Sequence, residues 1–173
     1  CGPVVVIVSI FANPIQFNDR NDFLNYPKTI EADLERCRAL GVDYVFVPSC
    51  EQIYASRPLS CDRHEPLMSG RCIIKPPPRM AQILEGKSRY NHFEGVLTVV
   101  AKLFNIIQPD RAYFGEKDFQ QLILVTKMTQ DFNMPIRICA VETAREPETN
   151  LPLSSRNVRL DFEQRRLAAQ MMY

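Results

Sequence analysis

The sequence predicts an α/β fold in which helices flank a parallel sheet. The first observation behind this prediction is a continuous, mostly β-branched run at residues 4–11, typical of a strand buried on both faces. The second is the alternation of helical periodicity with short strand-like runs along the rest of the chain. Ligands bind such sheets at the carboxyl ends of the strands, so the loops that follow strands are the candidate sites for chemistry.

The elements follow one another in βαβ order, with right-handed crossovers. A polar loop is expected at 13–26, and a helix is expected to begin at Pro27 and end at Gly41. The later predicted elements are a strand at 44–47, a long proline-rich surface loop at 50–78 with at most one short strand at 72–74, helical turns at 80–84, a helix at 93–107, a strand at 112–114, a helix at 119–132, a strand at 136–141, a polar loop at 142–157 and a last helix opened by the capping pair Asp161 and Gln164.

The bulk composition argues against several classes of function. With 173 residues, of which 46% are hydrophobic, the chain has the size and apolar content of one domain. Its 21 basic and 20 acidic residues leave a net charge of +1, which argues against a nucleic-acid partner. No apolar run reaches membrane-spanning length, and the first residues lack the charged region of a signal peptide. We therefore expect a cytoplasmic protein without a membrane partner.

The cysteines and histidines show no metal-ligand spacing. Six cysteines and two histidines are scattered along the chain, and no C-x-x-C pair occurs. No residue is therefore predicted to ligate a metal. Cysteines of a cytoplasmic protein are expected to be reduced, and a disulfide among them is the alternative.

The first candidate loop follows the strand at 112–114. Gly115 permits a sharp turn and a close approach to a ligand, and Lys117 offers a point charge suited to phosphate. Asp118 suits the cap of the next helix, whose N-terminus attracts anions. Gly115, Glu116, Lys117 and Asp118 thus form a candidate phosphate cradle. An ordinary capped turn with an exposed lysine is the alternative.

The second candidate loop precedes the last helix and contains Ser154, Ser155 and Arg156. Hydroxyl and guanidinium groups bind phosphate oxygens, the arginine in a bidentate manner. Such groups suit nucleotidyl transfer, because the departing pyrophosphate gains negative charge. Serine and asparagine are also common turn residues, and a plain turn is the alternative interpretation.

Amide and imidazole side chains mark further positions. Asn13 and Gln16 follow the first strand, and their amides suit a carboxylate or a hydroxyl, although a turn stabilised by Asn13 is favoured on local grounds. Arg89 and His92 precede the long helix. His92 is interpreted either as a cap of this helix or as a residue that contacts a ligand. A glutamine pair that opens the helix at 119–132 supplies one more candidate to face the same ligand.

Five segments taken together are more specific than any one of them. They are SIFANPIQF at 9–17, YPKTIEADL at 26–34, LEGKSRYNHFEGVLTVVAKLFNIIQPD at 84–110, YFGEKDFQQL at 113–122 and PLSSRN at 152–157. In this order they closely resemble the pantothenate synthetase family, over nearly the whole chain apart from 50–78. The resemblance implies a Rossmann-like nucleotidyltransferase fold. Residues 1–173 are then most of its N-terminal nucleotide-binding domain, truncated at both ends, with 50–78 as a loop insertion.

The resemblance also implies an ATP-dependent ligase. In this family pantoate attacks the α-phosphate of ATP, with Mg²⁺ present, to give pantoyl adenylate and pyrophosphate. The amine of β-alanine then attacks the acyl carbon, which gives pantothenate for coenzyme A biosynthesis and releases AMP. We accordingly expect a cytoplasmic homodimer that binds ATP, Mg²⁺, pantoate and β-alanine.

Residue roles are carried over from the same resemblance. Contacts to ATP are expected from Gly115, Glu116, Lys117, Asp118, Ala144, Leu153, Ser154, Ser155 and Arg156. Among these residues, Lys117, Ser154, Ser155 and Arg156 are expected to be catalytic, because they stabilise charge on the phosphates. Contacts to pantoate and β-alanine are expected from Asn13, Gln16, Arg89, His92 and Gln121.

The sequence departs from the family pattern at three places. The family's His-x-Gly-His motif, on the turn after its first strand, is absent, and the run at 4–11 resembles the family's second strand. Residues 89–92 read RYNH where Arg-Pro-Gly-His is usual, and 149–151 read TNL where Asp-Gly-Leu is common. Without the first strand, we expect exposed apolar surface and an open sheet edge.

Three hypotheses remain at this point. The chain is a piece of a complete ligase and is inactive alone, or it belongs to another nucleotidyltransferase of the same fold. The amides of Asn13, Gln16 and Gln121 argue against the second hypothesis. The third is a catalytically silent binding or dimerisation module, which the absent His-x-Gly-His motif supports.

Overall fold

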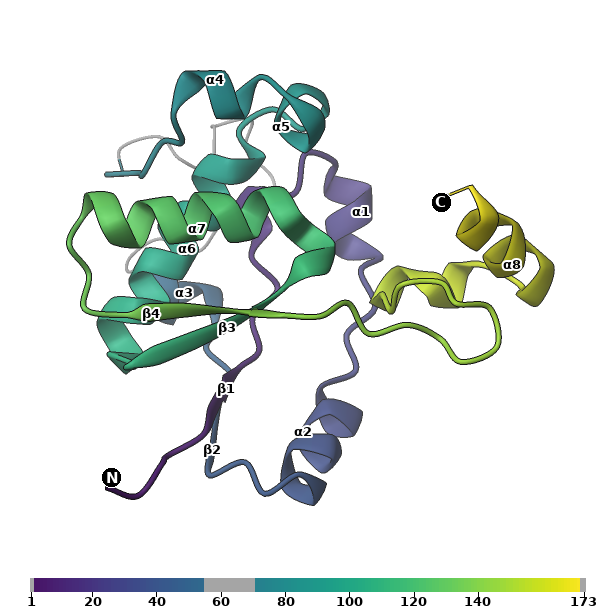
Figure 1. Cartoon of the computed structure of the whole chain (residues 1–173), viewed down its shortest axis with the longest axis horizontal. Coiled ribbons are helices and arrows are strands. Elements are labelled where there is room, and N and C mark those ends of the chain that lie inside the picture. Colours follow the sequence, from purple (N-terminus) through teal and green to yellow (C-terminus); the bar gives the residue numbers. More distant parts are fainter. Residues whose placement is uncertain (1, 55–70, 172–173) are drawn as a thin grey trace.

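The computed structural model describes residues 2–54 and 71–171, and it confirms the predicted α/β class (Figure 1). Strand β1 (Ile7–Ser9) pairs in parallel with β2 (Tyr44–Phe46), and β3 (Arg111–Gly115) pairs in parallel with β4 (Arg137–Val141). Within the described ranges the two pairs form separate two-stranded sheets. Because Gly115 lies opposite Val141, the carboxyl ends of β3 and β4 finish side by side.

The hydrophobic core lies around two long helices. Helix α6 (His92–Ile107) is buried on all sides over the seven consecutive residues 95–101, which are mostly apolar, as burial all round requires. Helix α7 (Phe119–Asp131) packs against α6, β3 and β4. Leu97, Leu124 and Val125 keep no more than 2% of their surface exposed. Burial of each such side chain contributes about 1.5–3 kcal/mol, so these helices form a firm frame for the loops after β3 and β4.

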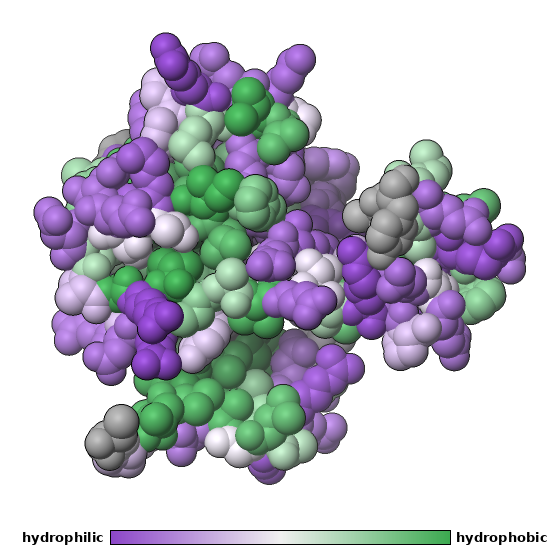
Figure 2. Space-filling view, in the orientation of Figure 1, coloured by the Kyte–Doolittle hydropathy of each residue, from purple (hydrophilic) through white to green (hydrophobic). Residues whose placement is uncertain are grey.

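Strand β1 is shorter and more exposed than the sequence predicts. Only three residues of the run at 4–11 pair with a neighbour, and Val4, Val5 and Val6 keep 84%, 56% and 46% of their surface exposed. The prediction of a strand buried on both faces is therefore wrong, because only β2 lies beside β1 in the described structure. Figure 2 shows the resulting apolar surface over β1 and β2. The expectation of exposed apolar surface is confirmed here.

The segment at 13–26 is not a loop throughout, which corrects the prediction. It contains the 3-10 turn η1 (Pro14–Gln16) and helix α1 (Arg20–Leu24). In each, a side chain before the first turn accepts a hydrogen bond from the backbone N–H two residues on: Asn13 does so for η1 and Asp19 for α1. Both elements are too short to show a helical period in the sequence.

Helix α2 (Ile30–Ala39) connects β1 to β2. It begins three residues after Pro27, with Thr29 at its N-cap, so the predicted start is wrong. The predicted end is confirmed. Gly41 takes the left-handed conformation, with φ of +71°, which glycine adopts without steric cost.

The start of the predicted loop at 50–78 is helical. Helix α3 (Cys50–Tyr54) is capped reciprocally by Ser49 and Gln52, because the side chain of each accepts from the backbone N–H of the other, at 3.3 and 2.7 Å. Ile53 and Tyr54 are buried, which fixes the helix against the core. Residues 55–70 lie outside the described part of the chain, so the loop stays a prediction there.

The predicted strand at 72–74 is absent. The backbone N–H of Ile74 donates to Oγ1 of Thr98 on α6, at 3.0 Å, instead of to a strand. A side chain therefore satisfies the backbone group that a neighbouring strand was expected to satisfy.

Short elements complete the described structure. They are α4 (Pro78–Ala81), α5 (Leu84–Ser88), η2 (Glu116–Asp118), η3 (Ser155–Arg159) and α8 (Phe162–Gln170). The predicted capping box of α8 is confirmed, with Gln164 N donating to Asp161 Oδ1 at 2.8 Å and Asp161 N donating to Gln164 Oε1 at 3.0 Å. Over residues 2–54 and 71–171, no helix is both long and apolar enough to cross a membrane.

Candidate functional site

The loops after β3 and β4 meet around one cavity of about 410 Å³. The parallel register makes them neighbours, because the two strands end at the same edge. The cavity is lined by Gly115, Lys117, Asp118, Val141, Glu142, Thr143, Ala144 and Leu153. The structure thus brings together, from three separate stretches of sequence, five of the residues expected to bind ATP. Glu116 is exposed in η2 and does not line the cavity.

The backbone of the β3–α7 loop differs from the prediction in two details. Gly115 has φ of −69° and ψ of 138°, an extended conformation, so it makes no sharp turn. A Cβ built on Gly115 meets no atom within 4 Å, and the missing side chain therefore leaves open space beside the cavity. Asp118 makes no side-chain hydrogen bond to the start of α7, so the predicted cap is wrong.

The ammonium group of Lys117 is only loosely held. Its Nζ lies 3.5 Å from Oδ1 of Asp118, and 37% and 48% of the two side chains are exposed. Exposed pairs of this kind contribute about 0–1 kcal/mol. Little free energy is therefore lost when Lys117 turns to an anion in the cavity.

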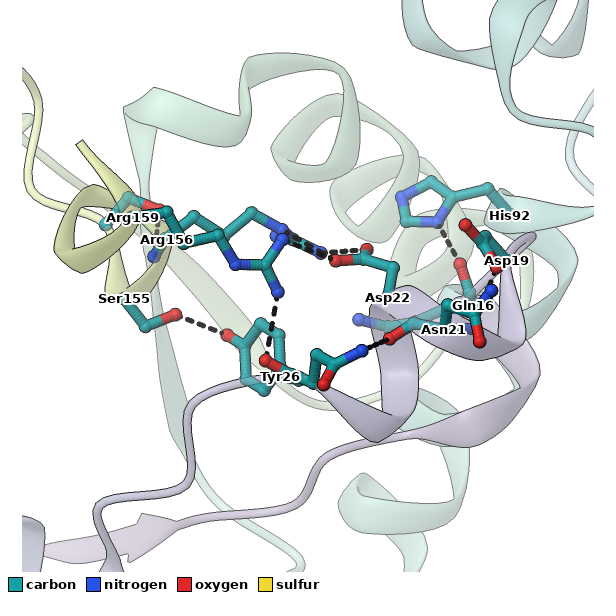
Figure 3. Close-up of polar contacts among 11 residues, drawn as sticks. Gln16, Asp19, Asn21, Asp22, Tyr26, His92, Ser155, Arg156 and Arg159 are labelled. Carbon is teal, nitrogen blue, oxygen red and sulfur yellow. Dashed lines mark hydrogen bonds and ion pairs between the residues drawn. The ribbon is translucent and has the colours of Figure 1, made fainter. Parts of the chain in front are cut away.

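The hydroxyls of the second candidate loop bond to protein groups and do not line the cavity, as Figure 3 shows for the bond of Ser155 to Tyr26. Ser154 Oγ accepts from the backbone N–H of Arg156 at 3.3 Å and thereby starts η3. Ser155 Oγ donates to the hydroxyl oxygen of Tyr26 at 2.8 Å. Leu153 is the member of this loop that reaches the cavity wall. The loop therefore links the cavity to α1 and the residues that follow it.

Arg156 contacts three side chains from the 17–26 region, of which Figure 3 shows Asp22 and Tyr26. Its Nη2 and Nε lie 2.7 and 3.4 Å from the two carboxylate oxygens of Asp22. Its Cζ lies 5.1 Å from the ring centre of Tyr26 and 5.8 Å from that of Phe17, which are cation–π distances. Hydrogen bonding to Asp22 raises the pKa of Arg156, and the carboxylate of Asp118 adds a smaller rise. One bidentate ion pair and two ring contacts therefore tie Arg156 to the 17–26 region.

The amide of Asn13 is fully engaged where η1 packs on α6. Asn13 is 2% exposed. Its Nδ2 donates to the carbonyl of Gly95 at 3.1 Å and to Gln16 Oε1 at 3.3 Å. Its Oδ1 accepts from Ile15 N at 3.3 Å and from Tyr54 Oη at 2.6 Å. Asn13 therefore positions the η1 turn. Gln16 is half-buried, so part of its side chain is exposed and can contact a ligand.

His92 closes the same junction from α6. It is 5% exposed, and its Nδ1 lies 2.8 Å from the carbonyl oxygen of Gln16. A carbonyl only accepts, so Nδ1 carries the proton and Nε2 is an acceptor. Burial lowers the pKa of His92 and favours the neutral ring, although the bond to Gln16 acts in the opposite direction. Asn91 is the N-cap of α6, so the interpretation of His92 as its cap is wrong.

The glutamine pair at the start of α7 divides into two roles. Gln120 points into the protein, where its Nε2 donates to the carbonyls of Met80 and Ile83 at 2.7 and 3.1 Å and so ties α4 and α5 to α7. Gln121 and Arg89 are half-buried, and their contacts to substrate stay predictions.

Few candidate metal ligands gather in the described residues. Over 2–54 and 71–171, no three His, Cys, Asp or Glu side chains cluster. Asp118 and Glu142 are the carboxylates that line the cavity. Cys37 and Cys139 form no disulfide in the described part of the chain.

Comparison with known proteins identifies the family. Residues 3–173 match the family profile described as pantoate-beta-alanine ligase. The chain belongs to the pantoate–β-alanine ligase family. It is 48% identical over 166 residues to the pantothenate synthetase of Oceanobacillus iheyensis, an alignment that covers 95% of the chain and 53% of that relative. It is 49% identical over 165 residues to the bifunctional pantoate ligase/cytidylate kinase of Synechococcus elongatus, over 95% of the chain and 29% of that protein.

Solved structures of this ligase family share the fold. The pantothenate synthetase of Thermus thermophilus superposes with a TM-score of 0.84 at 40% identity, over 95% of this chain and 55% of that one. The ligase of Francisella tularensis, solved with β-γ ATP and β-alanine, gives a TM-score of 0.84 at 42% identity, over 97% and 59% of the two chains. The Rossmann-like nucleotidyltransferase fold is thereby confirmed. The chain spans about half the length of these single-function relatives.

Two departures from the ligase family's sequence pattern place asparagine in a left-handed conformation. Asn91 and Asn150 stand where the family pattern usually has glycine, and both are left-handed, with φ of +55° and +61°. Asparagine tolerates this conformation better than other non-glycine residues do. The turns at 89–92 and 149–151 therefore keep the conformation that glycine permits.

Sequence reasoning missed the partners of the second candidate loop. Asp22 and Tyr26 contact this loop in the structure, and Asp22 accepts from both Arg156 and Arg159 of η3. Tyr26 lies in a segment that carries the family resemblance, which was the available signal for it. Asp22 lies in a polar stretch of asparagines and aspartates with no periodicity, and nothing in that stretch distinguishes it.

Proposed function

We propose that this chain forms the nucleotide- and pantoate-binding part of a ligase that condenses pantoate with β-alanine and cleaves ATP to AMP and pyrophosphate. The observation that carries the proposal is the cavity on which the loops after β3 and β4 converge, in a chain of the pantoate–β-alanine ligase family. The Francisella relative was solved with β-γ ATP and β-alanine, which are the ligands that the proposed reaction requires.

The proposed reaction has two steps. A carboxylate oxygen of pantoate attacks the α-phosphorus of ATP, and the bond from that phosphorus to the β-bridging oxygen breaks and releases pyrophosphate. The amine nitrogen of β-alanine then attacks the acyl carbon of pantoyl adenylate and loses a proton, and AMP leaves. The protein supplies position and charge rather than a covalent bond.

The ATP side of the site is proposed to lie along the cavity. Lys117 is loosely paired and is proposed to turn to the phosphates. Arg156, Ser154 and Ser155 are proposed to bind the phosphates as they separate, and the backbone of Ala144 to contact the adenine side. The open space at Gly115 leaves room for the nucleotide beside β3.

The pantoate side is proposed to lie between η1 and α7. Gln16 and Gln121 supply the amides that contact pantoate. Asn13 and His92 are proposed to position Gln16 from its buried side, because each forms a hydrogen bond to Gln16 and both are buried. Arg89 is proposed to face a substrate carboxylate from the turn before α6.

Mg²⁺ is proposed to be held mainly by ATP phosphates and water, with Asp118 or Glu142 as the carboxylates that line the cavity. This donor set suits an ion that gives up its water reluctantly and binds few protein carboxylates. When bound, Mg²⁺ neutralises phosphate charge. We also propose that the complete protein is a cytoplasmic homodimer that serves coenzyme A biosynthesis.

Isotope transfer tests the proposed route. The complete ligase is given pantoate labelled with ¹⁸O in its carboxylate, and the released AMP is analysed by mass spectrometry. Attack on the α-phosphorus predicts one ¹⁸O in AMP, and the same label in pyrophosphate or inorganic phosphate contradicts it. A silent binding module predicts no pantothenate and no AMP, and another nucleotidyltransferase predicts AMP release without a requirement for pantoate.

A further inference from the structure

Asp22 accepts hydrogen bonds from two arginines of η3 (Figure 3). Its Oδ2 accepts from Arg156 Nη2 at 2.7 Å, and its Oδ1 accepts from Arg156 Nε at 3.4 Å and from Arg159 Nη1 at 3.2 Å. Arg159 also donates from Nη2 to the carbonyl of Asn25 at 3.0 Å. One carboxylate on α1 thus holds two guanidinium groups that are 134 and 137 residues away in the sequence.

The contact leaves one edge of Arg156 available. A guanidinium has five N–H groups, and Asp22 takes the Nε edge together with one N–H of Nη2. Nη1 makes no hydrogen bond within the described residues, and 41% of the side chain is exposed. The aromatic rings of Tyr26 and Phe17 lie at cation–π distance from the guanidinium. Arg156 is therefore fixed on one edge and open on the other.

We propose that Asp22 is a positioning residue, which holds Arg156 so that its free edge is ready for a phosphate of the nucleotide. This inference rests on the proposed function, since it assigns the anion that Arg156 meets. Two guanidinium groups share one carboxylate, so the cluster keeps positive charge that attracts an anion. An arginine ordered before binding loses less conformational freedom when the anion arrives, which favours affinity.

The arrangement argues against Asp22 as a competitor of the nucleotide. A competing carboxylate has to leave Arg156 before phosphate binds. The phosphate is proposed to approach a different edge of the same planar group, and Arg159 also donates to Oδ1 of Asp22, which helps to keep the carboxylate in place. Asp22 is therefore expected to stay bound to Arg156 while the phosphate binds.

The first arm of the test observes Arg156 directly in this chain. The Nε–H resonance of Arg156 is recorded by NMR for wild type and for Asp22→Asn, with and without Mg-ATP. We expect slow hydrogen exchange in wild type, exchange at least tenfold faster in Asp22→Asn, and a protected resonance that persists when wild type binds Mg-ATP. Loss of protection on binding shows that Asp22 is displaced, and it overturns the proposal.

The second arm measures pantoate-dependent ATP–pyrophosphate exchange in the complete ligase. Asp22→Asn is expected to lower kcat/KM for ATP at least tenfold and to leave the KM for pantoate unchanged, while Asp22→Glu recovers to within threefold of wild type. Glu163→Gln is the matched control, because Glu163 pairs with Arg166 at 2.9 Å on the exposed face of α8. That variant is expected to behave as wild type.

The two proposals fail in different ways. An active wild type with Asp22→Asn within twofold of it, or an equal loss in Glu163→Gln, overturns the role of Asp22 alone. Tighter ATP binding by Asp22→Asn overturns it as well, since it shows competition. A folded wild type that exchanges no pyrophosphate overturns the proposed function, and the role of Asp22 in binding phosphate falls with it.

Discussion

The imidazole Nδ1 of His92 lies 2.8 Å from the carbonyl oxygen of Gln16, and this contact joins residues 76 positions apart in the sequence. It ties the first turn of α6 to the η1 turn, which presents the substrate candidate Gln16. The junction is close-packed, because Asn13 donates to the carbonyl of Gly95 one turn further along α6. The stability of the chain is therefore expected to depend on the residues that meet at this junction.

The neutral state of His92 predicts a pH-dependent stability. Burial holds the pKa of His92 below its ordinary value of 6.5, so the unfolded chain binds the proton more readily than the folded chain. The contribution of His92 to stability is therefore fully present above about pH 6.5 and is lost as the pH falls below it. We expect the free energy of unfolding from urea titrations to fall towards pH 5, by at most about 1.4 kcal/mol per pH unit for one proton.

His92→Asn separates this effect from other titrations. The amide of asparagine donates from a position close to that of Nδ1 but does not titrate, so this variant is expected to lose the slope between pH 5 and 6.5. His64→Gln removes the other histidine of the sequence, which takes no part in the contact with Gln16, and as the control it is expected to keep the slope. An unchanged slope in His92→Asn contradicts the assignment.

At the contact between α6 and η1, the backbone of η1 leaves no room for a side chain at Gly95. A Cβ at this position lies 3.0 Å from the backbone nitrogen of Gln16 and 3.0 Å from the carbonyl carbon of Ile15, so η1 has to move away from α6. We expect Gly95→Ala to lower the free energy of unfolding by about 1–3 kcal/mol, the usual range for overpacking. Gly2→Ala, where a Cβ meets no atom within 4 Å, is the control for chemical denaturation. Equal stability of the two variants contradicts the close packing.

Removal of the Tyr54 hydroxyl is expected to lower the stability of the chain while leaving the shape of the side chain nearly unchanged. It donates to Asn13 Oδ1 at 2.6 Å, and burial raises the pKa of Tyr54 well above its usual value. Tyr54→Phe removes the donor and is expected to cost about 1–2 kcal/mol in thermal unfolding. Tyr44→Phe is the matched control, since Tyr44 is 65% exposed. A loss of similar size in both variants means that the Tyr54–Asn13 bond contributes little.

Substitution of Lys117 is expected to lower the rate of the reaction without unfolding the protein. In the complete ligase, Lys117→Ala is expected to lower the rate of pantoate adenylation at least tenfold, as is Arg156→Ala, because each removes a charge proposed to bind phosphate. Lys127→Ala is the control, since Lys127 lies on the helix that follows the loop but pairs with Asp131 at 2.9 Å. Circular dichroism checks that all variants fold. A wild-type rate in Lys117→Ala removes the β3–α7 loop from the mechanism.

Long, strongly apolar segments were predictable from the sequence. The helices at 93–107 and 119–132 and the strands after each of them were confirmed to within about one residue, because the helices bury apolar residues at helical spacing and the short β-prone runs after them are clearly separated. The convergence of Lys117 and Ala144 on one cavity followed from the rule that parallel strands present their carboxyl ends together.

Short elements and long-range polar contacts were not predictable in the same way. Helices α1 and α3 each have five residues, too few to leave a helical period in the sequence, and local side-chain caps begin them. The bond of Asp22 to Arg156 joins residues that are distant in the chain, and only the folded backbone brings them together. The prediction that 4–11 is buried was wrong, because an apolar run indicates a strand but does not show which neighbouring elements cover it.

Pantoate-dependent exchange of labelled pyrophosphate into ATP, measured for this chain and for a form extended upstream of residue 1, decides whether this fold activates pantoate. The proposed function predicts exchange that requires pantoate in the extended form, and none in this chain alone. Exchange in neither form, with both shown to be folded, contradicts the proposal that this fold activates pantoate with ATP.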